Sequence, residues 1–151
     1  MPASADASTV ARDHDSGDAM GDYTIKPLGE MPDVLGNYPG EMRMITYEVD
    51  AEQVALTFRR MPPNTGGKGS YGHFHKTQEE LYLVLSGTLQ FKLGETVVDV
   101  PGGTAVRVSP ETARSVWNEG PEDAELVIAS LKIEDPSGDS VAVPNFWPAG
   151  D

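Results

Sequence analysis

Cysteine is absent from the 151-residue sequence, which excludes disulfides, thiolate metal sites, iron–sulfur clusters and cysteine nucleophiles. Basic residues are few, since 11 lysines and arginines stand against 24 aspartates and glutamates, for a formal net charge of -13. Nucleic acids and anionic membrane surfaces are bound by clustered positive charge, so neither is an expected partner. The longest apolar run, Leu81–Leu85, is too short to span a bilayer, and the N-terminus has no basic segment followed by an apolar one. The sequence therefore predicts a cytoplasmic protein.

The two ends of the chain differ in composition from its middle. Residues 1–22 hold five aspartates among small residues, and such a segment buries too little apolar surface to offset its ordering entropy, so we expect a disordered acidic tail. Residues 23–151 are expected to form one domain, because the length and the 38% hydrophobic content suit a single core. Near the C-terminus, Val143–Pro148 carries two prolines, which exclude a regular central strand and predict an extended arm on the barrel or on a partner.

Short segments rich in β-branched and aromatic residues alternate with turn residues from Tyr23 onward, and the chain holds 16 glycines and 12 prolines. This pattern predicts many short antiparallel strands in an all-β barrel or sandwich. Val54, Leu56 and Phe58 alternate with other residues, as expected of a strand with one buried face. The predicted strands are Tyr23–Leu28, Arg43–Val49, Gln53–Met61, Tyr71–His75, Glu80–Leu85, Thr88–Leu93, Thr96–Val100, Ala105–Val108, Ser115–Trp117 and Glu125–Ile133.

One predicted strand, Glu80–Leu85, has apolar residues on both faces. Leu81, Leu83 and Leu85 share one face, and the opposite face mixes polar with apolar residues. A second sheet or a second subunit must then cover the leucine face. We expect a homodimer.

Two of the three histidines, His73 and His75, stand two residues apart, so in a strand their side chains point to the same side. Glu80 follows after a short turn that can bring its carboxylate beside the imidazoles. Two histidines and one carboxylate on a barrel wall suit iron(II), manganese, nickel or zinc and leave positions open for substrate or water. The alternative is a pair of structural histidines, or a His–Glu hydrogen bond in a polar lumen.

These residues resemble the first motif of the cupins, which is a glycine, a His-x-His pair, a glutamate and a second glycine at set spacings. The motif is met by Gly67, His73, His75, Glu80 and Gly87. The resemblance implies an antiparallel cupin barrel, which is a double-stranded β-helix or jelly roll. It also implies that His73, His75 and Glu80 match the metal-ligand positions of the family.

The second cupin motif is met only at its ends, by Gly103 and Asn118. Ser109 and Glu111 replace its proline and inner glycine, and Arg114 falls where the family has a further histidine ligand. Arginine stays protonated and cannot offer a lone pair to a metal. This departure places metal binding in question.

Arg114 has three possible roles at this position. It can pair with Glu80 or Glu79, or it can hold the carboxylate or phosphate of an anionic ligand while the other three residues keep a metal. A shift in strand register would instead turn Arg114 to solvent.

Two neighbours of Glu80 are further candidates. Tyr82 shares a face with Glu80 and can line the cavity or donate a proton, or it can be a plain core aromatic. Gln78 lies in the turn before Glu80, where it can contact the ligands or simply be solvated.

The leading hypothesis is a cupin that binds a divalent metal through His73, His75 and Glu80 and acts on a small molecule, which can be anionic, with Arg114 and Tyr82 as catalytic residues. Resemblance to small cupins implies oxygenase, isomerase or epimerase-like chemistry. The second hypothesis is a metal-free binding module in which Arg114 neutralises Glu80 or an anionic ligand. The third is a structural protein whose barrel supports a dimer.

Overall fold

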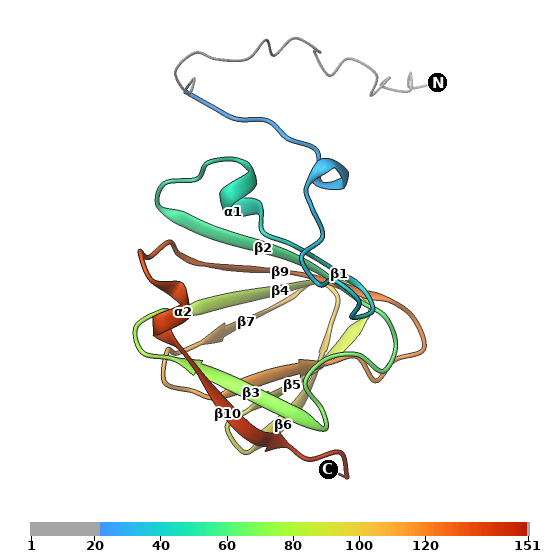
Figure 1. Cartoon of the computed structure of the whole chain (residues 1–151). Helices are drawn as coiled ribbons and strands as arrows, with labels where there is room; N and C mark the ends of the chain where they lie inside the picture. Colours follow the sequence, from blue (N-terminus) through green and yellow to red (C-terminus); the bar gives the residue numbers. More distant parts are fainter. Residues whose placement is uncertain (1–21, 151) are drawn as a thin grey trace, which may run out of the picture.

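The computed structural model describes residues 22–150, and in this part of the chain two five-stranded antiparallel sheets face each other (Figure 1). The predicted all-β class is confirmed, whereas the tail predicted at residues 1–22 lies outside the described residues except for Asp22. The first sheet has the order β1 (Glu41–Arg43), β2 (Val54–Met61), β9 (Ala124–Leu131), β4 (Glu80–Ser86) and β7 (Thr104–Val108). The second has the order β10 (Ser140–Trp147), β3 (Ser70–His75), β8 (Arg114–Trp117), β5 (Thr88–Leu93) and β6 (Thr96–Pro101).

Two of the predicted strands are wrong. Tyr23–Leu28 forms no strand and leads into a short 3-10 helix, η1 (Leu28–Glu30). Within Arg43–Val49, only Arg43 belongs to a strand, and a single helical turn, α1 (Ile45–Glu48), follows. The reason is a contact with β2, because the Thr46 hydroxyl accepts from the backbone N–H of Leu56 and donates to its carbonyl. A side chain thus satisfies backbone groups that strand pairing would otherwise need.

A third short helix, α2 (Pro136–Asp139), precedes the last strand. No helix among residues 22–150 is long and apolar enough to cross a membrane. The last strand, β10, is not among the predicted strands. Its position nevertheless agrees with the prediction that the two prolines of Val143–Pro148 exclude a regular central strand. It is an edge strand that pairs only with β3, and its register breaks between Val143 and Trp147, where Pro144 lies.

The face of β4 that points into the molecule is the one with Tyr82 and Val84, which are 2% and 0% exposed. Leu81, Leu83 and Leu85 remain 50%, 38% and 46% exposed on the outer face, so the second sheet does not cover them. The core between the sheets consists of Met61, Tyr82, Val84, Leu89, Phe91, Val100, Val108, Ala124 and Leu126.

Strand β2 likewise turns its more polar face inward. Ala55, Thr57 and Arg59 line a cavity of about 920 Å³ between the sheets. Since side chains alternate along a strand, Val54 and Phe58 face outward from this cavity. One end of the sandwich is therefore filled by core side chains, and the other encloses an open cavity with polar groups in its wall.

Candidate metal centre

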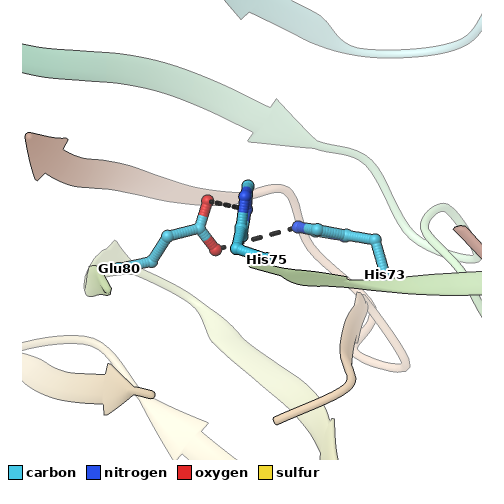
Figure 2. A group of neighbouring side chains, drawn as sticks. All are labelled: His73, His75 and Glu80. Carbon is cyan, nitrogen blue, oxygen red and sulfur yellow. Dashed lines mark hydrogen bonds and ion pairs between the residues drawn. The ribbon is translucent and has the colours of Figure 1, made fainter. Parts of the chain in front are cut away.

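Three side chains, two from the second sheet and one from the first, converge at this cavity (Figure 2). His73 and His75 project from the same side of β3, and Glu80 begins β4 after a short turn. One ligand atom from each lies within 4.8 Å of the other two. His75 Nε2 is 3.1 Å from Glu80 Oε1, and His73 Nε2 is 3.8 Å from Glu80 Oε2. The alternation of side chains along β3 and the turn before β4 therefore bring His73, His75 and Glu80 together, as predicted.

Asp139, at the end of α2, contacts the far side of the His75 ring. Its Oδ2 is 3.1 Å from His75 Nδ1, and the carboxylate also accepts from Thr77 and from the backbone N–H of Gln78. Burial alone would raise the pKa of Asp139, but the donors from Thr77, Gln78 and His75 outweigh it and lower this pKa. Asp139 stays ionised and holds both the β3–β4 turn and the His75 ring.

The Asp139 contact decides which His75 nitrogen faces the cluster. Because a carboxylate can only accept, Nδ1 carries a proton toward Asp139, and in the neutral form of the ring the Nε2 lone pair then faces Glu80 Oε1. Two lone pairs 3.1 Å apart repel unless a proton or a metal cation lies between them. Two ligands at roughly 2.1 Å from one ion and about 90° apart are separated by about 3 Å, so this spacing fits a shared divalent metal.

Arg114 lies on β8, directly across from His73 on β3, and is 0% exposed. Its Nε donates to Glu80 Oε2 at 3.0 Å, and Nη1 donates to the carbonyls of Pro110 and Thr112. The alternative in which a register shift turns Arg114 to solvent is therefore wrong. The contact agrees with the alternative in which Arg114 pairs with Glu80. Glu79 pairs instead with Arg107.

Tyr82 is both a core residue and a partner of Glu80. Its ring packs edge-on against Phe91, with centroids 5.3 Å apart, and its hydroxyl donates to Glu80 Oε2 at 2.5 Å. Burial and the neighbouring Glu80 charge raise the pKa of Tyr82. The phenol therefore keeps its proton. Gln78 is 7% exposed and bonds to β9 through Ser130 and Leu131, so it is not a solvated turn residue.

Glu80 is ionised despite its burial. Desolvation raises the pKa of this carboxyl, but His73, Tyr82, Arg114 and His75 together lower it to about 2. Because Tyr82 and Arg114 both donate to Oε2, Oε1 is the oxygen left facing His75. A charged carboxylate with one free oxygen beside two imidazoles has the chemistry of a metal-ligand set.

The outer residues of the two sequence motifs have structural roles. A Cβ on Gly67 would lie 1.7 Å from Ser115 Oγ, and Gly87 has φ +72° with Ala124 against it. Asn118 is fully buried and donates to the carbonyls of Met61 and Glu122. These positions hold the strands and turns in place, while His73 and Glu80 face the cavity.

Comparison with protein families agrees with this architecture. The family described as Cupin domain matches residues 58–130, the segment from β2 to β9 that carries both motifs. A cupin protein from Bacteroides fragilis superposes with a TM-score of 0.59 over 79% of this chain and 92% of that protein, at 16% identity. Residues 58–130 thus match the cupin domain family, and the predicted antiparallel cupin jelly roll is confirmed.

Two further solved structures share the fold. A predicted oxalate decarboxylase from Thermotoga maritima aligns at 19% identity and TM-score 0.59, over 72% of this chain and 99% of its own. A polyketide cyclase from Streptomyces resistomycificus aligns at 16% identity and TM-score 0.60, over 71% and 78%. At these identities the likeness concerns the fold, and function has to be argued from the residues of this chain.

Proposed function

We propose that this cupin binds one divalent transition metal, iron, manganese, nickel or zinc, through His73, His75 and Glu80 and acts on a small molecule in the cavity. The observation that carries the proposal is the convergence of the three ligand atoms within 4.8 Å on the wall of that cavity. A metal bound there supplies a Lewis acid for a substrate oxygen and, if iron, redox chemistry as well. Two of the similar structures are named as a decarboxylase and a cyclase, which supports an enzyme that acts on a small molecule. For this chain we propose oxidoreductase or isomerase chemistry.

The residues around the cluster would prepare it for a metal. Asp139 holds the proton of His75 on Nδ1, which leaves Nε2 free to bind. Tyr82 and Arg114 hold Glu80 through Oε2, which fixes the direction of Oε1. Little reorganisation is then needed when the ion binds.

Arg114 and Tyr82 are the proposed catalytic residues. Both line the cavity. Arg114 Nη2 is buried and has no hydrogen-bond partner among residues 22–150, which supports the prediction that Arg114 orients an acidic group of the substrate. The hydroxyl of Tyr82 stays protonated and is the proton donor that lies beside Glu80.

A metal-free binding protein is the second candidate, and one contact favours it. The Arg114 guanidinium stands 3.0 Å from Glu80 Oε2, where the family has a further histidine ligand. Its charge neutralises Glu80 and opposes a nearby dication. The cavity would then hold a small molecule without catalysis.

Metal titration of chelator-treated protein tests the first candidate against the second. We expect one site per chain, with His75→Ala weakening binding about a hundredfold or more, because a ligand and its Asp139 support are lost together. The matched control is His14→Ala, which changes the histidine outside the motif and should leave the titration unchanged. Equal loss in both variants, or no binding by the parent protein, would reject the proposed site.

The exposed leucine face of β4 supports the proposed homodimer. Leu81, Leu83 and Leu85 form a contiguous apolar stripe on the outside of the first sheet, and such a stripe is normally covered by another surface.

A further inference from the structure

Arg59 is a positive charge in the cavity wall that has no counter-ion in the part of the chain that the structure describes. It lies on the inward face of β2, and its buried Nε has no hydrogen-bond partner among residues 22–150. Its neighbour Arg60 points outward and pairs with both Glu41 and Glu125. Two adjacent arginines thus differ, because within residues 22–150 the outward one has two carboxylate partners and the cavity one has none.

An unpaired guanidinium in this position is unfavourable for the free protein. Burial lowers the pKa of Arg59, and the other groups that act on its charge are the phenols of Tyr38, Tyr82 and Tyr71, with no carboxylate among them. Arginine nevertheless stays protonated, so its desolvation cost is not removed by losing a proton. Among residues 22–150 no acidic side chain forms an ion pair with Arg59, and its Nε has no hydrogen-bond partner there. The missing anion is best supplied by a ligand.

The cavity wall near Arg59 shows what that ligand looks like. Tyr38 and Tyr71, two of the phenols that act on the Arg59 charge, line the cavity and are 43% and 61% exposed, so their rings are available for contact. Met42 and Met44 add flexible apolar surface beside them. Tyrosine rings with methionines form a surface suited to a flat aromatic body.

The position of Arg59 in the sheet separates its function from that of the metal centre. Arg59 pairs in register with Leu126, and Leu126 pairs with Val84. Glu80 lies four residues from Val84 along β4, which is about 13 Å along the strand direction. The two sites are thus offset along the backbone, with the phenol of Tyr82 acting on Arg59 and donating to Glu80. A ligand that fills the cavity of about 920 Å³ can place one group at Arg59 and another at the cluster.

We propose that Arg59 binds the carboxylate of an aromatic acid whose ring system lies against Tyr38 and Tyr71 and whose far end reaches the His73, His75 and Glu80 cluster. This substrate class rests on the proposed function for the identity of the reacting end, whereas the carboxylate site itself requires no metal. Arg59 then determines the preference for a ligand that carries a carboxylate. Its charge lacks a partner in the free protein and gains one when the ligand binds.

Calorimetric binding of 2-naphthoate and its neutral counterpart 2-naphthamide tests the proposal directly. We expect the parent protein to bind the acid about tenfold or more tightly than the amide, and Arg59→Met to reduce binding of the acid to that of the amide. Arg107→Met is the matched control, since Arg107 is exposed and pairs with Glu79. It should retain the preference for the acid.

Thermal unfolding without ligand adds a second readout. A structural arginine would stabilise the protein, so its loss would lower the Tm, whereas a ligand-binding arginine without partners destabilises the free protein. We expect Arg59→Met to melt at a higher temperature than the parent protein. A lower Tm together with an unchanged preference for the acid would overturn the proposal.

His73→Ala separates this inference from the metal proposal. It should lose metal and still prefer 2-naphthoate over 2-naphthamide. If the parent protein binds no metal but shows the preference, the metal function fails and the Arg59 site stands. If the parent protein binds neither compound, binds both equally, or keeps its preference in Arg59→Met, the aromatic-acid site is wrong.

Discussion

Arg114→Met is expected to lower the free energy of unfolding by about 3 kcal/mol at neutral pH in the presence of a chelator. The variant leaves the Glu80 carboxylate, whose side chain is 13% exposed, without its arginine partner, and it also removes two donors to the carbonyls of Pro110 and Thr112. The effect lies at the lower end of the range for breaking a buried ion pair, because Tyr82 and His75 still contact Glu80. Denaturant unfolding measures it.

The same variant should change the pH dependence of stability. The pKa of Glu80 is lowered from 4.5 to about 2 in the folded protein, so its ionisation stabilises the fold above the unfolded pKa, and this contribution is lost as the pH falls through 4.5 toward 2. Without Arg114 the folded pKa rises, and the difference between the variant and the parent protein should shrink as the pH falls through this window.

Arg107→Met is the control for this experiment, because its pair with Glu79 is exposed on both sides and should contribute little. Equal stability losses in the Arg114 and Arg107 variants at neutral pH would contradict the assignment of Arg114 as the buried partner of Glu80.

Arg114→His is expected to raise metal affinity roughly a hundredfold at neutral pH. Position 114 pairs in register with His73, so a histidine there shares the side of the sheet that carries the cluster. The substitution removes a positive charge beside the ion and adds an imidazole ligand. Metal titration of folded variant and parent protein measures the change.

Arg107→His provides the comparison for this gain, since it adds a histidine away from the cluster. If Arg114→His binds metal no better than the parent protein or the Arg107 variant, Arg114 is not what limits metal binding in this barrel.

The part of the site that could be predicted from sequence is the part formed by neighbouring residues. His73 and His75 alternate along one strand, and Glu80 follows one turn later, so local geometry is enough to bring them together. Gly67 and Gly87 were recognised at fixed spacings, and the structure explains them by contacts that exclude a Cβ.

The features missed by sequence reasoning depend on contacts between distant segments. Asp139 contacts His75 across 64 residues, and nothing in its own neighbourhood indicates a histidine partner. Thr46 turns a predicted strand into a helical turn through its bonds to Leu56. Both contacts depend on long-range packing, which overrides local propensity.

The inward face of a strand was also hard to assign. Both faces of β4 and β2 carry apolar residues: Leu83 and Val54 point outward, whereas Glu80 and Arg59 share the inward faces with buried Val84 and Met61. Alternation predicts two faces but does not say which one lines a polar cavity. The unpaired charge of Arg59 became visible only once its surroundings were known.

Elemental analysis of the untagged protein, purified without chelator and expressed as metal per chain, tests the central claim most directly. The account predicts close to one iron, manganese, nickel or zinc per chain in the parent protein and a strong loss in His73→Ala. A folded parent protein that carries no metal and takes up none when iron, manganese, nickel and zinc are offered would contradict the metal site and leave the metal-free binding protein as the function of this barrel.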